Sequence, residues 1–208
     1  AGAWLLVSNA GFGTRGHLVE LPVERETAEV MVNTVAMHRL CCVALEVNAG
    51  HREGGIITTV STAGFQPIPY MATYSATKAF MLHFSEALAV EAQEAGVRVM
   101  AFCPGPVRTE FIEGVFTSSQ EGRVNPFLME VEQCVRIGLR DFDRGHTISV
   151  PGVLNHATAL LVPHIPRAVV RGLSGRFMRT AGFDRTHAPA ERSTSGRGAG
   201  RGKGAARR

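Results

Sequence analysis

Residues 4–16, WLLVSNAGFGTRG, decide the kind of fold that the rest of the chain builds on. The apolar run Trp4–Val7 predicts a buried strand, and Gly11–Gly16 fits the pattern G-x-G-x-x-G. After a strand, that pattern is typical of a turn whose glycines let the backbone approach a pyrophosphate at a helix N-terminus. Pro22 follows six residues after Gly16, so no helix is expected directly after the glycines. We interpret the stretch as a look-alike of the phosphate-binding turn.

Strands and long helices alternate along the rest of the chain. The sequence predicts helices over residues 24–47, 73–95 and 130–141, and further strands over 56–61, 97–103 and 146–150. This alternation predicts the α/β class, with a Rossmann-like, doubly wound parallel sheet in three α/β/α layers. Ligands of such sheets bind beyond the carboxyl ends of the strands, where the sequence places Asn9–Gly13, Ser61–Gly64, Pro104–Thr109 and Pro151–Gly152.

Charge divides the chain into a folded domain, residues 1–185, and a disordered basic tail, residues 186–208. The tail has six Lys or Arg against one Glu, so the chain's net charge of +4 leaves about −1 for the domain. Its lack of apolar side chains larger than alanine predicts disorder. The domain is therefore not a basic module, and we expect no nucleic-acid partner. The tail is interpretable either as a solubilising extension or as a segment that contacts anionic partners.

Cysteine and histidine usage favours a reduced compartment and no metal. Cys41, Cys42, Cys103 and Cys134 form no C-x-x-C pair, and the eight histidines show no metal-ligand spacing. No apolar run reaches the ~18 residues of a membrane span, and the first residues lack the order of a signal peptide. We expect a cytoplasmic protein. The apolar segment 154–178, interspersed with arginines, is expected either to cover a pocket or to touch a membrane surface.

The candidate catalytic residues are Ser61, Tyr74 and Lys78. Tyr74 and Lys78 are four residues apart on one helix face, and Ser61 ends a predicted strand thirteen residues earlier. A phenol that transfers a proton near neutral pH needs its pKa of about 10 lowered, which requires that the phenolate be stabilised by about 3–4 kcal/mol. One cation about 4 Å away supplies about 4 kcal/mol at an effective dielectric of about 20. The pattern indicates that Tyr74 transfers a proton, that Lys78 lowers its pKa and that Ser61 holds the substrate oxygen.

With their flanking motifs, these residues resemble the short-chain dehydrogenase/reductase family over about residues 4–152. Ser61, Tyr74 and Lys78 match the family's Ser and Tyr-x-x-x-Lys, and Asn33 matches its fourth catalytic residue. Two further segments are similar to family motifs: Ser8-Asn9-Ala10-Gly11 to Asn-Asn-Ala-Gly, and Pro104-Gly105-Pro106-Val107-Arg108-Thr109 to Pro-Gly-x-x-x-Thr.

The resemblance implies an NAD(P)-dependent oxidoreductase that moves a hydride between the nicotinamide and a carbonyl or secondary alcohol carbon. It implies that Tyr74 is the acid or base, that Lys78 also binds the nicotinamide ribose and that Asn33 holds a water of the proton relay. NADP(H) is expected in preference to NAD(H), in a homo-oligomer (dimer or tetramer). The implied cofactor contacts are Asn9, Ala10, Gly11, Tyr74, Lys78, Pro104, Gly105, Val107 and Thr109. From the residues alone, Asn33 is also interpretable as a satisfied polar group in a helix, and Thr109 as a turn residue.

Two departures and one cluster complete the expectations. The family's glycine-rich phosphate loop and first β-α units have no counterpart in residues 1–208. We therefore expect an N-terminally truncated member whose first strand is an exposed edge, and the alternative is a non-catalytic remnant or partner subunit. An apolar pocket for a lipid-like, steroid-like or aromatic carbonyl substrate is predicted around Phe65, Pro67, Ile68, Pro69, Tyr70 and Met71, with Phe111, Phe116 and Phe127.

Overall fold

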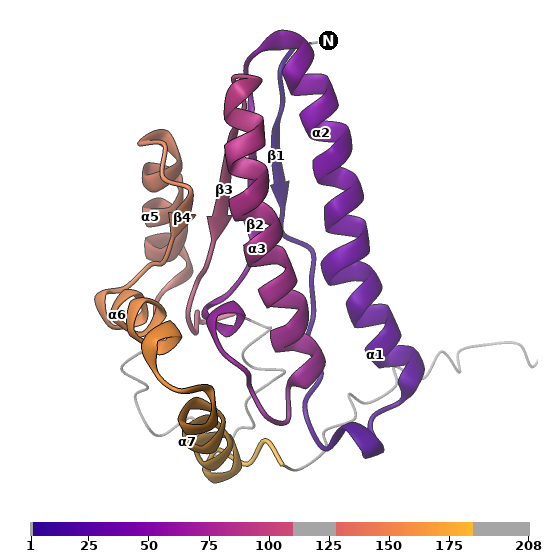
Figure 1. Cartoon of the computed structure of the whole chain (residues 1–208), viewed down its shortest axis with the longest axis vertical. Coiled ribbons are helices and arrows are strands. Elements are labelled where there is room, and N and C mark those ends of the chain that lie inside the picture. The colour runs from indigo at the N-terminus through magenta and orange to yellow at the C-terminus, as the bar shows by residue number, and fades with distance from the viewer. Residues whose placement is uncertain (1, 110–127, 185–208) are drawn as a thin grey trace, which may run out of the picture.

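Four parallel strands form the centre of the molecule (Figure 1). The structure is a computed structural model that describes residues 2–109 and 128–184. The strands are β1 (Leu5–Ser8), β2 (Gly55–Thr59), β3 (Arg98–Phe102) and β4 (Ile148–Ser149), and they lie side by side in the order β1-β2-β3-β4. In the parallel pairing, Val7 of β1 lies opposite Ile57 of β2, and Ile57 lies opposite Met100 of β3. The Rossmann-like α/β class is confirmed.

The predicted long helices are present, with bounds shifted by a few residues. After β1, α1 (Val23–Val30), a π-helical segment (Met31–Ala36) and α2 (Met37–His51) form one continuous helix. The remaining helices are α3 (Ala72–Glu94), α5 (Val131–Asp143), α6 (Val153–Leu161) and α7 (Arg167–Thr180), with 3-10 turns at Leu18–Glu20, Thr62–Phe65 and Val162–His164. Since α1 begins only after Pro22, the prediction that no helix follows Gly16 directly is confirmed.

Helices cover both faces of the sheet, as the three-layer prediction requires. Side chains of a strand alternate between faces, so Ile56 and Ile57 of β2 point to opposite layers. Ile56 joins a core cluster with Met37 of α2 and Met81 of α3. Ile57 joins Met100, Phe102 and Phe142 of α5 on the other face. A Cβ on Gly138 would lie 2.6 Å from the Phe102 ring, so glycine allows α5 to approach this closely.

The first strand is not buried, which corrects the prediction made from its apolar run. Leu5 and Val7 are 52% and 51% exposed, because β1 is at the edge of the sheet and α5 packs beside β3 and β4, with its Phe142 reaching β2. The expectation of an exposed apolar edge is thereby confirmed. The side-chain amide of Asn48 in α2 holds the start of the strand, donating to Trp4 O (2.9 Å) and accepting from Trp4 N (2.7 Å).

The continuous helix Val23–His51 is long and apolar enough, by length and composition alone, to cross a membrane. It packs against β1 and β2 and buries Met37, Cys41 and Ala44, so we interpret it as a layer of the α/β fold. Its Cys41 is one of three buried free cysteines. The others are Cys103 and Cys134, while Cys42 is exposed.

Candidate active site

The three predicted catalytic side chains meet at the carboxyl end of β2. Ser61 follows the strand and caps the next 3-10 turn by accepting from Ala63 N at 3.1 Å. Tyr74 and Lys78 are buried in the first two turns of α3. The Ser61 and Tyr74 side chains are hydrogen-bonded, and Lys78 Nζ lies 5.6 Å from the Tyr74 ring centroid. The convergence expected from the sequence is therefore present.

The protonation of the pair differs from the expectation. Burial raises the pKa of Tyr74 to about 12, although the hydrogen bond with Ser61 acts in the opposite direction. Burial lowers the pKa of Lys78 to about 8. The lysine is thus neutral at the pH where the phenol ionises, and its Nζ donates to Thr59 O (2.8 Å). Burial is thus the largest influence on the pKa of Tyr74 in the resting site, and near neutral pH Tyr74 is a protonated phenol beside a mostly charged ammonium. That Lys78 lowers the pKa of Tyr74 stays a prediction.

Asn33 is fully buried in the π-helical segment and joins three parts of the chain. Its Nδ2 donates to Phe12 O (2.9 Å) and to Thr77 Oγ1 (3.0 Å), while Phe12 N donates to Asn33 Oδ1 (3.1 Å). Thr77 lies between Tyr74 and Lys78 on α3, so Asn33 ties the loop after β1 to the catalytic helix. Both amide hydrogens are used, and the side chain has none to donate to the water that the resemblance implies.

The glycines of the opening stretch lie against the catalytic residues. A Cβ on Gly13 would lie 2.8 Å from the Tyr74 ring. A Cβ on Gly11 would lie 3.0 Å from Asn33 Oδ1 and 3.6 Å from Lys78 Nζ. The G-x-G spacing therefore serves close packing of the loop on the catalytic side chains. Only the three-residue 3-10 turn Leu18–Glu20 lies between the glycines and Pro22, so no α-helix begins there to bind a phosphate.

Glu29 is a residue that the sequence reasoning missed. It lies one turn before Asn33, is 0% exposed and accepts from both Thr14 N and Thr14 Oγ1 at 2.9 Å through Oε2. Its Oε1 has no hydrogen-bond partner among the residues the structure describes. Burial raises the pKa of this carboxyl to about 7, and its charge in turn raises the pKa of Tyr74 and of Lys78. The available signal was an acidic residue four positions from Asn33 on the buried helix face.

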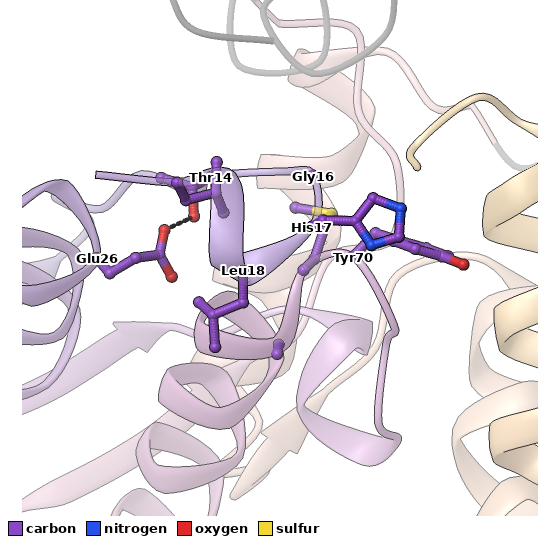
Figure 2. A pocket seen from close by; sticks show the side chains of 9 residues that line it. Thr14, Gly16, His17, Leu18, Glu26 and Tyr70 are labelled. Carbon is purple, nitrogen blue, oxygen red and sulfur yellow. Dashed lines mark hydrogen bonds between the residues drawn. The ribbon is translucent and has the colours of Figure 1, made fainter. Parts of the chain in front are cut away.

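A cavity of about 200 Å³ opens beside this cluster (Figure 2). The carboxylate of Glu26 accepts a hydrogen bond from the Thr73 hydroxyl at its wall and shares the single hydroxyl hydrogen of Thr14 with Glu29. The rings of His17 and Tyr70 meet edge to face with centroids 5.1 Å apart. The cavity is lined by Thr14, Gly16, His17, Leu18, Leu21, Glu26, Tyr70, Met71 and Ala72.

Only some of the residues predicted to form an apolar pocket line this cavity. Tyr70 and Met71 line the cavity, Ile68 packs against the cluster around Tyr74, and Phe65 packs against the main core. Phe111, Phe116 and Phe127 lie outside the described residues. Ser61, Tyr74 and Lys78 are not among the lining residues, but Met71 is close to both the cavity and the Tyr74 ring.

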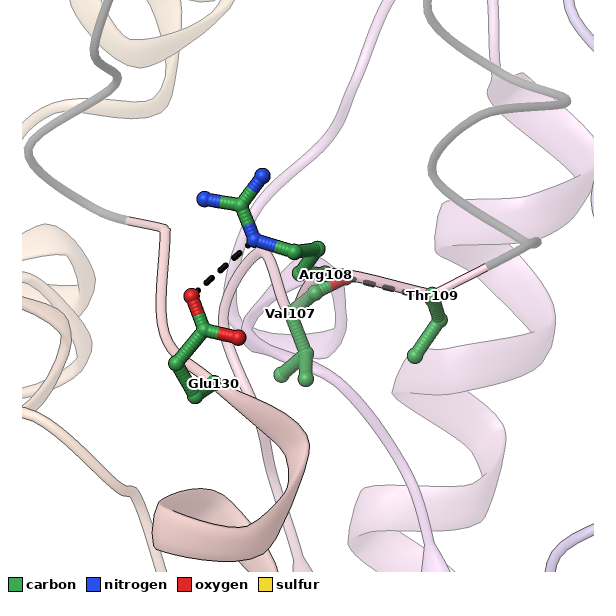
Figure 3. A network of polar contacts seen from close by, with 4 residues as sticks. All are labelled: Val107, Arg108, Thr109 and Glu130. Carbon is green, nitrogen blue, oxygen red and sulfur yellow. Dashed lines mark hydrogen bonds and ion pairs between the residues drawn. The ribbon is translucent and has the colours of Figure 1, made fainter.

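The predicted cofactor contacts flank Ser61 on either side of β2. Asn9, Ala10 and Gly11 follow β1 and are exposed, and the partly buried segment Pro104–Thr109 follows β3. Figure 3 shows that Thr109 Oγ1 donates to Val107 O (3.1 Å), which also fits the alternative of a turn residue, and that Arg108 Nε pairs with Glu130 (3.0 Å). Gly105 packs against the Asn155 side chain. The exposed Asn9–Gly11 on one side of β2 and the partly buried Pro104–Thr109 on the other, with the Lys78 ammonium between them, suit the nicotinamide half of a dinucleotide. In the described part of the chain, no group of three His, Cys, Asp or Glu side chains is placed to hold a metal.

Comparison with known proteins agrees with this geometry. The profile of the short chain dehydrogenase family matches residues 2–120. An uncharacterized oxidoreductase of Myxococcus xanthus is 31% identical over 141 residues, which are 68% of this chain and 53% of that protein. The short-chain dehydrogenase of Sphingobium yanoikuyae in complex with NADPH superposes with a TM-score of 0.63 at 30% identity, covering 79% of this chain and 66% of that one. The bulky-bulky ketone specific alcohol dehydrogenase of Comamonas testosteroni superposes with a TM-score of 0.61 at 30% sequence identity. The match covers 79% of this chain and 64% of that one. The chain spans about half the length of the curated relatives it matches.

Proposed function

Because this chain belongs to the short-chain dehydrogenase family, we propose that it acts as an NAD(P)-dependent oxidoreductase on CH–OH groups. The reaction is hydride exchange between the nicotinamide and a carbonyl or secondary alcohol carbon. The observation that carries the proposal is the hydrogen-bonded pair of Ser61 and Tyr74 at the end of β2, with Lys78 beside the ring. Such a group can hold a substrate oxygen and exchange a proton with it.

The protonation of the site favours the reductive direction. A bound nicotinamide supplies the hydride. Tyr74, protonated near neutral pH, gives its proton to the alkoxide oxygen that forms, while Ser61 hydrogen-bonds that oxygen. The phenolate left behind faces the Lys78 ammonium, with 5.6 Å between Nζ and the ring centroid. At an effective dielectric of about 20, that attraction is worth about 3 kcal/mol. A charged Lys78 thus stabilises the phenolate, which opposes the rise in the pKa of Tyr74 that burial causes.

We propose that the cofactor is NADP(H) in preference to NAD(H), and that Asn9–Gly11, Pro104–Thr109 and Lys78 hold it. The similar Sphingobium yanoikuyae enzyme in complex with NADPH supports it. The substrate we propose is a bulky apolar carbonyl. Tyr70 and Met71 in the cavity wall support this class, as does the similarity to an alcohol dehydrogenase specific for bulky-bulky ketones.

We propose a homo-oligomer because of exposed apolar side chains, and a cytoplasmic location because of the free thiols. Exposed apolar side chains on α2 and α3, among them Leu40, Val43 and Phe80, support a homo-oligomer. Free cysteines support a cytoplasmic location. Light scattering of the purified chain measures the first, and fractionation of cells measures the second.

Titration with NADPH and NADH, followed by reduction of a bulky aryl ketone, tests the function. Tyr74→Phe should keep cofactor binding and reduce turnover by about 10²–10⁴-fold, because it removes only the proton donor. Thr158→Val also removes a hydroxyl, at an exposed position of α6, and as the control it should leave turnover within a few-fold. Unchanged turnover in Tyr74→Phe would contradict the mechanism. Absence of binding to either nucleotide would instead favour the alternative of a non-catalytic remnant or partner subunit.

A further inference from the structure

The outward faces of α6 and α7 are apolar, the reverse of the pattern that solvent-exposed helices show. On α6, the buried side chains are Asn155 and Ala159, and the opposite face presents Val153 (91% exposed) and Leu161 (62%). On α7, Val170, Gly175 and Met178 face inward. The outward stripe of α7, at a spacing of four residues, is Val169, Leu173 and Phe177, of which Phe177 is 67% exposed.

The charge of the same segment is one-sided. Residues 151–183 contain four arginines (Arg167, Arg171, Arg176 and Arg179) and no Asp or Glu. Residues 1–150 contain 11 Lys or Arg against 16 Asp or Glu, a net charge of −5. None of the ion pairs found between described residues includes an α7 arginine. Apolar side chains beside unpaired arginines are typical of helices that lie in the headgroup region of a bilayer.

We propose that this outward face of α6 and α7 docks on an anionic phospholipid membrane. The positive segment is attracted to anionic headgroups, while residues 1–150, with their net charge of −5, are repelled, so the charge distribution also orients the domain. A second copy of the chain is a poorer occupant. In a two-fold interface the same surface meets itself, which would bring the arginines of both copies together with no carboxylate in the segment to pair with them.

The inner side of this face is in contact with the candidate catalytic helix. Met178 and Phe183 pack in one cluster with Ala63, Met71 and Tyr74. Figure 1 shows α7 beyond the end of the sheet toward which the strands point. Docking would therefore place the bilayer against the element that covers Tyr74, where a lipid-like carbonyl compound could enter the site. This last step rests on the proposed function; the docking itself does not.

Flotation of the full chain with vesicles tests the proposal. We expect binding to vesicles of phosphatidylcholine mixed with phosphatidylglycerol, and at most weak binding to phosphatidylcholine alone. The double variant Leu173→Ser, Phe177→Ser should weaken binding by more than about ten-fold. Arg171→Gln with Arg176→Gln should weaken it by roughly five-fold per arginine. These four side chains are exposed, so circular dichroism should show an unchanged fold.

Matched surface variants separate this face from the rest of the molecule. The controls are Val19→Ser with Val90→Ser, and Arg39→Gln with Arg136→Gln, all at exposed positions outside α6 and α7. The controls should bind like the unchanged chain. Because residues 186–208 are present in every variant, binding that only the α7 variants lose reports the α7 face. Equal binding by all variants would overturn the proposal, as would conversion of an oligomer to a monomer by the Leu173 and Phe177 changes. Ketone reduction in detergent-free solution is measured separately, so failure of docking and failure of the proposed activity are distinguishable.

Discussion

Replacement of Glu29 by glutamine should stabilise the protein at alkaline pH and have a much smaller effect at acidic pH. The carboxyl is 0% exposed, is held by two hydrogen bonds from Thr14 and has one oxygen without a described partner. Burial raises its pKa from 4.5 to about 7. Glutamine keeps the size of the side chain and an oxygen that accepts from Thr14, but it carries no charge to bury.

The sign and size follow from the two pKa values. The folded state binds the Glu29 proton more tightly than the unfolded state, so stability falls as pH rises from about 4.5 and the loss is complete above about 7. A difference of about 2.5 units at 1.36 kcal/mol each makes the full cost about 3 kcal/mol, present at about pH 8. At about pH 5, the same relation leaves under about 1 kcal/mol. Glu29→Gln should therefore gain about 3 kcal/mol in the free energy of unfolding at the higher pH.

Urea unfolding of both proteins at the two pH values measures this, and at about pH 8 the melting temperature should rise by about 6–12 °C. The exposed Glu24→Gln is the matched control in the same helix and should change stability by less than about 0.5 kcal/mol at either pH. If Glu29→Gln gains the same amount at both pH values, or loses stability at about pH 8, the buried carboxylate does not carry the cost argued here.

Three further substitutions test the packing and charges of the site. Gly13→Ala should lower turnover in steady-state kinetics by about ten-fold or more, because its Cβ would press on the Tyr74 ring at 2.8 Å. The control Gly50→Ala in α2, whose Cβ would have no atom within 4 Å, should leave turnover unchanged. Equal effects of the two substitutions would refute the reasoning. Asn33→Ala should cost about 2–4 kcal/mol in urea unfolding, since it removes three hydrogen bonds in a buried site, and a loss below about 1 kcal/mol would contradict the bracing role. Lys78→Met should abolish turnover yet raise the free energy of unfolding at about pH 7 by roughly 1–3 kcal/mol, because the pKa of Lys78 is about 8 in the folded state and 10.5 in the unfolded state. The gain should shrink as the pH rises from about 8 to 10.5. Destabilisation at neutral pH would show that the hydrogen bond to Thr59 O outweighs burial of the charge.

Local patterns determined the elements and the candidate catalytic residues. Apolar periodicity placed α3 within one residue of its observed start and end, because helix geometry depends on neighbours three and four positions apart. The same geometry put Tyr74 and Lys78 on one face. The strand after Gly54 and its terminal Ser61 followed from a β-branched run of residues, and Pro22 was enough to predict that no helix follows Gly16 directly.

Only the tertiary structure decided how these groups act on one another. Asn33 bonds to Thr77 across 44 positions of the chain, and Gly13 meets the ring of Tyr74 far along the sequence. The burial that raises the pKa of Glu29 and lowers that of Lys78 comes from the elements packed around them, as does the exposure of β1 and of the apolar face of α7. Periodicity shows that a helix or strand has an apolar side. Whether that side is covered, and whether a charge loses its water there, depends on which distant segments pack against it.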